Sequence, residues 1–348
     1  ALVVYALCDA EALAVVLSPD AARIVRLGKA DRVREACAEV LAAMNRGKAT
    51  TRGLDNRSQP ESSEARWTQA AARARKLLVE PLRLGADTQQ VLLSPQGPIG
   101  YVPFGAVFDV PVALTPSATT HVLLHDEDRH RGQGILALGD PDYQCKARGG
   151  EEECGVYLRG VRLKPLPGTR IEAKTVGTDV LLGRAANEVA LQERLAKRRR
   201  WRSVHLACHG IVDPERPLMS SLALSTARDS DGFLSVLEVQ RMSIPADLAV
   251  LSACETAVGR IEQGEGIVGL MRAFMHAGTP RVLCSLWQVD DEATKALMVK
   301  FYELWNPRAA PGDAEQGAKG RAEGARGMAA AAALKAAQAH VRAQKRWS

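Results

Sequence analysis

Short apolar runs separated by polar turn residues occupy the beginning of the chain. The runs "LVVYALC", "ALAVVLS" and "RIVRLG" are broken by Asp9-Ala10-Glu11 and by Ser18-Pro19-Asp20. Runs of this length joined by turn residues predict a meander of antiparallel strands over residues 1–27. Helical patterns follow at about 30–45 and 64–80, and "QQVLLSP" then predicts a buried strand.

A different pattern begins near Gly134. The apolar runs "GILALGDPDY", "VHLACHG", "ADLAVLSAC" and "RVLCSLWQV" alternate with helical patterns such as "GIVGLMRAFMHAG" and "DEATKALMVKFYELW". Continuous apolar strands that alternate with helices are typical of an α/β fold whose parallel sheet is covered on both faces. We therefore predict two domains, 1–133 and 134–348. Within the second, the low-complexity stretch 307–327 is expected to be a mobile loop.

Composition narrows the class of protein. The 348 residues are 46% hydrophobic and 25% charged with a net charge of +6, as in ordinary globular proteins, and the 4% aromatic content argues against nucleic-acid binding. Seven scattered cysteines without any CxxC predict reduced thiols in the cytoplasm and no zinc site. No membrane span or signal peptide is expected. The chain begins at Ala1, as a piece of a longer protein would.

Two of the predicted strands run into chemically reactive residues. "VHLAC" leads into His209, and "LAVLSA" leads into Cys254, which lies 45 residues later. Ligands bind outside the carboxyl ends of parallel strands, so both residues are expected to open onto the same crevice. A nearby imidazolium lowers the pKa of a thiol and can protonate a leaving amine. The order and the rough separation also resemble the caspase arrangement, in which the histidine lies about 50 residues upstream of the cysteine.

Each motif alone has a simpler explanation. A cysteine after an apolar strand is usually a small buried hydrophobe, and a His-Gly pair is a common turn. The other candidates are assigned to structure. His205 and Cys208 alternate inside a strand and are expected in the core, as is Cys284. His276 lies in the last turn of a helix, where a cation meets the negative end of the helix dipole.

The glycines Gly264, Gly266 and Gly269 spell the pattern of a dinucleotide-binding loop, with Asp290 and Asp291 about 20 residues further on. That fingerprint needs its first glycine directly after the strand, yet Gly264 is the tenth residue after Cys254, which ends the strand. We therefore expect no nucleotide cofactor. The glycines are expected to let a loop bend and to let the following helix pack closely on the sheet.

Four blocks together resemble a known family. "HLACHG", "LSACETAVG", "GEGIVGLMRAFMHAG" and "SLWQVDDEATKALMVKFY" are similar to the signature blocks of CHAT domains. These domains are caspase-like cysteine peptidases of bacteria, are often fused to tetratricopeptide repeats, and are related to separases. The blocks cover about residues 200–305, and the upstream "GPIGYVPFGAVF" extends the resemblance over most of the chain.

The resemblance implies a caspase–haemoglobinase fold with His209 as general acid and base and Cys254 as nucleophile. It also implies an oxyanion hole formed by the backbone amides of Gly210 and Cys254. For the first block, 1–133, the family comparison implies an inactive caspase-like or accessory α/β half.

The resemblance further implies a specificity site. Separase-type relatives place an acidic residue after the strand equivalent to "SLWQV", where it selects a basic P1 side chain. Asp291 matches that position best and Asp290 is its neighbour, so cleavage after Arg or Lys is expected. Both aspartates are equally explained as caps of a helix that starts at Glu292.

Three further residues are implied in substrate binding. Ser285 and Trp287, on the strand before the aspartates, would hold the substrate backbone as an added strand. Asp213, just past the histidine, would line the cleft, although a proline-flanked turn explains it equally well.

The resulting hypothesis is a bacterial cysteine endopeptidase without a cofactor that cleaves particular protein substrates, such as a pore-forming zymogen or a regulator. Regulation by a sensor or tetratricopeptide-repeat region and a role in defence or programmed cell death follow from the family context. Neither such repeats nor the family's usual closing segment occurs in this sequence. The alternative is a non-catalytic, caspase-like interaction scaffold, and nucleotide binding is the third possibility.

Overall fold

The computed structural model describes ten stretches of the chain, which fall into two units. One unit is Ala1–Asp128 with Met328–Ala336, and the other is Arg129–Gly327 with Ala337–Ser348. No helix in these stretches combines the length and the apolar character that crossing a bilayer requires. The predicted loop 307–327 lies outside them, and the predicted boundary at 133/134 stays a prediction. The described residues are 1–45, 61–126, 131–143, 156–158, 161–213, 215–252, 254–257, 265–285, 291–306 and 328–344.

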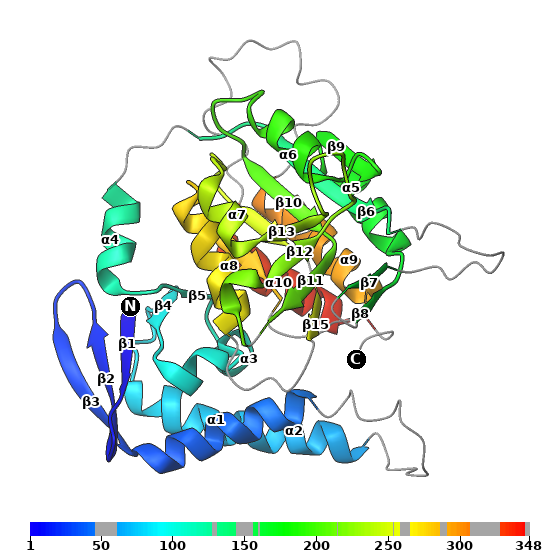
Figure 1. The fold of residues 1–348 in the computed structure, drawn as a ribbon. Helices are drawn as coiled ribbons and strands as arrows, with labels where there is room; N and C mark the ends of the chain where they lie inside the picture. Colours follow the sequence, from blue (N-terminus) through cyan, green and yellow to red (C-terminus); the bar gives the residue numbers. More distant parts are fainter. Residues whose placement is uncertain are drawn as a thin grey trace. The chain divides into compact units, whose positions relative to one another are not determined.

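The first unit contains a five-stranded sheet in the order β3-β2-β1-β4-β5 (Figure 1). β1 and β3 pair antiparallel with β2, which confirms the predicted meander, and β4 joins β1 in parallel. Alternate side chains of β1 and β2, such as Val3 and Tyr5, are buried, as expected for strands with one face on a core. The strands are β1 (Leu2–Leu7), β2 (Glu11–Leu17), β3 (Ala22–Lys29), β4 (Val91–Ser94) and β5 (Val112–Leu114).

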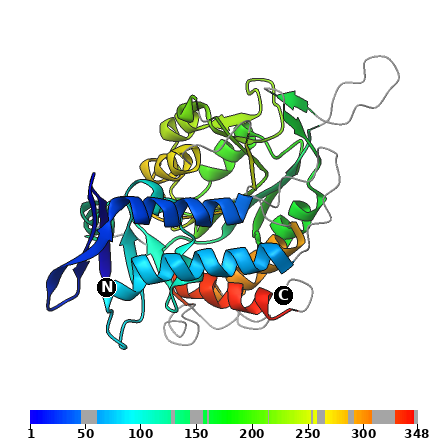
Figure 2. The same ribbon diagram turned by 90° about the horizontal axis from the view of Figure 1, so that it is seen from below.

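Helices α1 and α2 of this unit run side by side (Figure 2). The predicted helix at 64–80 is α-helical only to Ala74, and its continuation Arg75–Val79 has π-helical hydrogen bonds. That segment places the carbonyl oxygen of Leu78 2.8 Å from the hydroxyl of Tyr5, which donates to it. The helices are α1 (Ala30–Asn45), α2 (Glu61–Ala74), α3 (Phe104–Val107) and α4 (Ala118–Asp126), with 3-10 turns at Glu80–Leu82 and Gly97–Tyr101.

The second unit contains the predicted parallel sheet. Its five strands lie in the order β16-β14-β10-β6-β9, and every neighbouring pair is parallel. All five residues of β10 are buried, including the polar Ser203 and His205, as expected for a strand covered on both faces. The strands are β6 (Ile135–Pro141), β9 (Asp179–Gly183), β10 (Ser203–Ala207), β14 (Ala249–Leu251) and β16 (Val282–Cys284).

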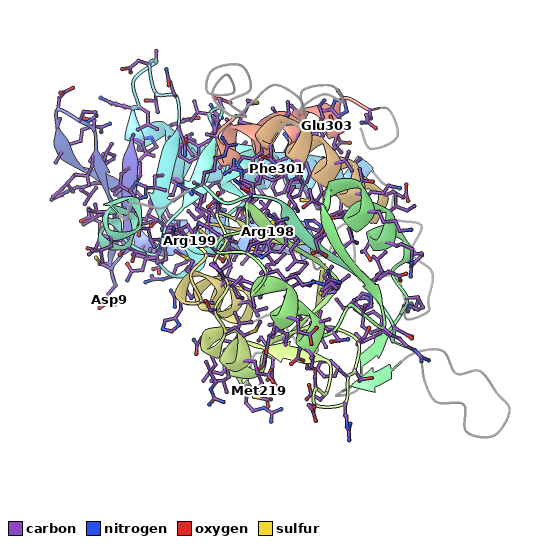
Figure 3. The ribbon with its side chains drawn as sticks, turned by 90° about the horizontal axis from the view of Figure 1, so that it is seen from above. Asp9, Arg198, Arg199, Met219, Phe301 and Glu303 are labelled. Carbon is purple, nitrogen blue, oxygen red and sulfur yellow. The ribbon has the colours of Figure 1, made fainter. Side chains whose placement is uncertain are left out.

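Helices cover both faces of this sheet. α5 packs on β6 and on α9, which turns Phe301 into the core and leaves Glu303 exposed (Figure 3). The opposite face packs against α6, α7 and α8 in one large cluster that includes the fully buried Trp201. These helices are α5 (Pro167–Val176), α6 (Glu188–Leu195), α7 (Val236–Arg241), α8 (Glu265–His276) and α9 (Asp291–Trp305); α10 (Ala330–Arg342) contributes residues to both units.

A smaller four-stranded sheet, β13-β12-β11-β15, continues two strands of the large one (Figure 1). The predicted strand 204–210 is interrupted at Cys208, where β10 ends and β11 begins, and the strand predicted to reach Cys254 stops at Leu251 before β15. The chain therefore passes from the large sheet into the small one twice, from β10 to β11 and from β14 to β15. The strands are β11 (His209–Val212), β12 (Ser221–Ala223), β13 (Phe233–Ser235) and β15 (Cys254–Ala257), and β7 (Val156–Leu158) pairs with β8 (Val161–Leu163) as a separate two-stranded ribbon.

Candidate active site

Four predicted strands of the large sheet end at the same edge. Because the sheet order is β16-β14-β10-β6, the residues that follow these strands, Ser285, Cys254, His209 and Tyr143, come in that order across the carboxyl edge. Parallel sheets bind ligands at this edge. The expectation that β10 and β14 are parallel members of one sheet is confirmed, and the two strands are also direct neighbours.

His209 and Cys254 are register partners. They are the first residues of β11 and β15, which pair in parallel with His209 opposite Cys254. Leu206 of β10 pairs with Leu251 of β14, and His209 of β11 pairs with Cys254 of β15. In both sheets the paired residues are 45 positions apart, so the register is the same before and after the chain changes sheet. The backbone therefore brings the two residues together. The side chain of Cys254 lies outside the described part, and its contact with the imidazole stays a prediction.

The half-buried His209 is held at three points. Its ring nitrogen Nε2 lies 2.8 Å from the carbonyl oxygen of Lys164, the residue after β8. Its backbone N–H donates to the hydroxyl of Tyr143 at 3.3 Å. The ring of Tyr143 lies against the imidazole with a centroid separation of 5.3 Å. Ring orientation and backbone position are thus both fixed.

The contact with Lys164 also assigns the tautomer. A carbonyl oxygen only accepts hydrogen bonds, so Nε2 of His209 carries the proton. Nδ1 is then the nitrogen through which the ring can take a proton and return it. The hydrogen bond at the first nitrogen sets the role of the second.

Tyr143 stays a neutral phenol in this environment. It is 5% exposed, and burial, with a smaller contribution from Cys208, raises the pKa of its hydroxyl well above the usual range. A neutral hydroxyl donates and accepts at once. It donates to the carbonyl oxygen of Ala223 at 2.8 Å while it accepts from His209.

Other thiols near this edge are poor candidates for the nucleophile. Cys208 precedes His209 directly, but it is buried, as predicted, and burial raises its pKa to about 12. Cys284 is partly exposed at the end of β16 rather than in the middle of a strand, and burial of its sulfur raises its pKa to about 12. Thiols with such pKa values carry almost no thiolate at neutral pH.

The predicted oxyanion and cleft residues flank the histidine. Gly210 lies inside β11, buried, with Leu222 of β12 and Glu255 of β15 as register partners. Asp213 follows β11 and forms a turn in which its carboxylate accepts from the backbone of Arg216 at 2.9 Å and pairs with the guanidinium at 3.1 Å. The turn explains Asp213 structurally, and its role in a cleft stays a prediction, as does the oxyanion role of Gly210.

The predicted substrate-binding residues at 285–291 are only partly described. The sequence predicted that Ser285 lies within a strand. In the structure it comes immediately after β16. Asp291 is the first residue of α9. Trp287 and Asp290 lie outside the described residues, between these two points. Ser285 lies at the same carboxyl edge as the residues after β14, because Cys284 pairs with Leu251 of β14.

The glycine pattern belongs to a helix. Gly266 and Gly269 are inside α8, which begins at Glu265, and Gly264 lies outside the described residues. A Cβ at Gly269 would be 3.7 Å from the side chain of Val236 on α7. At Gly269 the helix therefore faces α7, whereas Leu270 and Phe274 of α8 pack in the cluster on the sheet.

His205 is a buried residue of β10, as predicted, but its partners were not foreseen. Nε2 lies 3.0 Å from the carboxylate of Glu172 on α5, and the hydroxyl of Tyr302 on α9 lies 3.4 Å from Nδ1. Tyr302 also bonds Ser203 at 2.9 Å. These contacts join both helices on one face to the strand that precedes His209.

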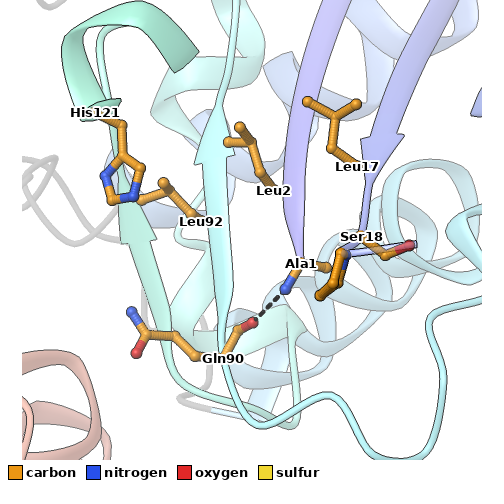
Figure 4. Close-up of a pocket in the computed structure, with 8 residues that line it drawn as sticks. Ala1, Leu2, Leu17, Ser18, Gln90, Leu92 and His121 are labelled. Atoms are coloured by element: carbon orange, nitrogen blue, oxygen red, sulfur yellow. Dashed lines mark hydrogen bonds between the residues drawn. The ribbon is translucent and has the colours of Figure 1, made fainter. Parts of the chain in front are cut away.

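A separate pocket lies in the first unit. It has a volume of about 420 Å³ and includes the Ala1 amine, which donates to the carbonyl oxygen of Gln90 at 3.0 Å (Figure 4). None of the predicted site residues lines it. Within the described stretches no group of three or more His, Cys, Asp or Glu side chains could hold a metal ion. The lining residues are Ala1, Leu2, Leu17, Ser18, Pro19, Gln90, Leu92 and His121.

Comparison with protein families decides the assignment. Residues 68–348 match the CHAT domain family. The chain belongs to this family. CHAT domains are caspase-like cysteine peptidases, and the helix-covered parallel sheet of this CHAT protein fits the caspase-like fold that the sequence predicted. Among curated proteins, none matches the chain significantly.

Proposed function

We propose that this CHAT protein is a cysteine endopeptidase that uses His209 and Cys254 as its catalytic dyad. The observation that carries the proposal is their pairing in register on adjacent parallel strands. Side chains at partner positions leave a sheet on the same face, the arrangement that proton transfer between an imidazole and a thiol requires.

The chemistry follows from the tautomer. Nδ1 of His209 takes the thiol proton of Cys254, and the thiolate adds to the scissile carbonyl carbon. When the tetrahedral intermediate collapses, the imidazolium gives that proton to the leaving amine, and the C–N bond breaks to leave a thioester. Water, deprotonated by the same imidazole, then hydrolyses the thioester and restores the thiol. The Lys164 carbonyl favours the charged ring in each half of the cycle.

Specificity for a basic P1 residue completes the proposal. Asp291, with Asp290, would pair with an Arg or Lys side chain, and Ser285 and Trp287 would align the substrate backbone. The position of Ser285 after the strand next to β14, and of Asp291 at the start of α9, supports this assignment. The oxyanion would be held by the amides of Gly210 and Cys254.

The proposed biological setting is cleavage of particular protein substrates in the bacterial cytoplasm, under control of a sensor region, in defence or programmed cell death. The support for this setting is the family membership together with the seven scattered cysteines. A pore-forming zymogen or a regulator is the substrate class proposed.

The test is cleavage of a proteome-derived peptide library, because short peptides avoid the need for a particular folded substrate. New N-termini are sequenced after incubation with native protein, Cys254→Ala and His209→Ala. We expect cuts after Arg and Lys with native protein only; Cys8→Ala, which removes an exposed thiol, is the matched control and should keep the activity. Cleavage that survives Cys254→Ala contradicts the mechanism, and cleavage after Asp contradicts the assigned P1 pocket. The scaffold alternative is favoured if no peptide is cleaved and the rate of Cys254 alkylation is the same in native protein and in His209→Gln.

A further inference from the structure

Tyr143 occupies a particular place between three elements of the second unit. It follows β6 at the carboxyl edge, and its side chain packs with Leu163 of β8, Ile211 of β11 and Ala223 of β12. No sequence motif marked it as part of the site. Its ring and its hydroxyl both contact His209.

The end of β6, which precedes Tyr143, is itself fixed. Asp140 has a left-handed backbone with φ of 45°, which redirects the chain as β6 ends, and its N–H donates to Thr169 Oγ1 of α5 at 2.8 Å. Two residues later the N–H of Asp142 donates to Ser225 Oγ at 2.7 Å. The backbone that carries Tyr143 is therefore held from two sides, as a positioning element needs to be.

The hydroxyl of Tyr143 joins two paired strands at the level of the histidine. His209 and Ala223 are register partners in β11 and β12. The hydroxyl accepts from the N–H of His209 at 3.3 Å and donates to the carbonyl oxygen of Ala223 at 2.8 Å. A shift of β11 along β12 would break this bridge, so the bridge fixes where the Cα of His209 lies.

The phenol ring acts on the imidazole itself. The two rings are 5.3 Å apart at an angle of 44°, while Nε2 is held by the Lys164 carbonyl. Aromatic contact at this separation favours particular ring orientations. One residue thus contacts both the backbone N–H and the ring of His209.

We propose that Tyr143 is a positioning residue for the His209 imidazole, which sets the distance over which His209 exchanges a proton with Cys254. This inference rests on the proposed dyad. It assigns Tyr143 no contact with substrate, and its effect is transmitted through His209 alone.

A second buried tyrosine offers a matched control. Tyr5 is 2% exposed, and its hydroxyl donates to the Leu78 carbonyl oxygen at 2.8 Å, while its ring stacks on Phe104. It belongs to the first unit and its core. Tyr5→Phe removes a buried hydrogen bond from a phenol to a backbone carbonyl, as Tyr143→Phe does, but in the unit that does not contain His209.

The experiment measures the rate of alkylation of Cys254 against pH, by mass spectrometry, in native protein, Tyr143→Phe, Tyr5→Phe and His209→Gln. We expect Tyr143→Phe to slow the reaction at pH 6.5 by about three- to tenfold, the equivalent of one lost hydrogen bond. Tyr5→Phe should leave the rate unchanged although both variants lose similar thermal stability. Equal rates in the two variants would overturn the role of Tyr143.

The same series separates this inference from the proposed function. If His209→Gln leaves the pH profile unchanged, the dyad itself fails; if His209→Gln alters the profile and Tyr143→Phe does not, only the inference about Tyr143 fails. Should Tyr143→Phe not fold, 3-fluorotyrosine at position 143 keeps both ring and hydroxyl. Its ¹⁹F resonance should titrate with the imidazole and stop titrating in His209→Gln. A ¹⁹F chemical shift that does not change with pH would contradict the contact between Tyr143 and the imidazole of His209.

Discussion

His209 lies directly opposite Cys254 in the ladder between β11 and β15. The two residues each begin a strand, immediately after the chain has crossed from the large sheet into the small one. The crossing preserves the 45-residue offset of the paired strands β10 and β14. A rigid, fully buried pair of strands therefore determines the separation of the two catalytic candidates, whereas a pair of loops would leave it variable.

Replacement of either member of the dyad is expected to abolish proteolysis without loss of the fold. Cys254→Ala and His209→Ala should each reduce kcat/KM by at least about 10³-fold, because members of a catalytic unit act together. Circular dichroism and the melting temperature should stay close to those of native protein. Retention of more than a tenth of the activity in either variant would rule out the assigned roles.

Alkylation should distinguish the cysteines. Burial raises the pKa of Cys37, Cys208 and Cys284 to about 12, so at pH 8 these thiols should remain unmodified by iodoacetamide. The exposed Cys8 should react at the rate of a free thiol, and Cys254 should react faster. Peptide mapping after timed quenching gives each rate. Rapid labelling of Cys208 in folded protein would show that the strand before His209 opens.

Glu188 at the start of α6 should make stability depend on pH. Burial, with smaller contributions from Glu238 and Asp231, raises its pKa, so the folded state binds the proton more tightly than the unfolded state. Stability is then lost as pH rises from the unfolded value of about 4.3 through the raised folded value. Glu188→Gln should therefore raise the melting temperature at pH 7 by a few degrees and leave it unchanged below about pH 4.

The control for this prediction is Glu193→Gln, which removes an exposed carboxylate from the same helix. It should leave the melting temperature within about one degree of native at both pH values. An equal stabilisation by both substitutions would mean that net charge, rather than burial of Glu188, is responsible.

Gly139 is predicted to be intolerant of a side chain. A Cβ there would meet the carbonyl oxygen of Thr169 and stand 2.9 Å from the Cβ of Ala173, so α5 would have to move off β6. Gly139→Ala should cost about 1–3 kcal/mol, as overpacking does. Because α5 follows Lys164, whose carbonyl holds His209, the peptidase rate should fall as well.

Gly100→Ala is the comparison, since its Cβ would be 3.9 Å from the nearest side-chain atom, Cγ of Pro95. Urea unfolding should show a change within about 1 kcal/mol for that variant. If Gly139→Ala is equally mild, the packing of α5 on β6 is looser than the contacts indicate.

The strands and their order of appearance could be predicted because apolar periodicity is a local property. β10 and β14 are buried on both faces, and their sequences are apolar apart from Ser203 and His205 of β10. The rule that ligands bind outside the carboxyl ends of parallel strands then placed His209 and Cys254 at one crevice. The break at Cys208 could not be predicted, because the residues on both sides are equally apolar and the partners of β11 come from distant segments.

The supporting residues of the histidine were missed for two different reasons. Lys164 contributes a backbone carbonyl, which any residue type would supply. Tyr143 did carry a signal, since it follows a predicted strand at the same edge as His209, and the rule used for the dyad could have been applied to it. The pairing of His205 with Glu172 depends on how α5 packs on the sheet, which periodicity alone does not determine.

The most direct test of the dyad is the pH profile of Cys254 alkylation in native protein and in His209→Gln. We predict that native protein keeps a thiolate at pH 6, with a rate within a few-fold of that at pH 8, whereas His209→Gln behaves as an ordinary thiol of pKa about 8.5 and reacts about 100-fold more slowly at pH 6 than at pH 8. Superimposable profiles for the two proteins would contradict the dyad.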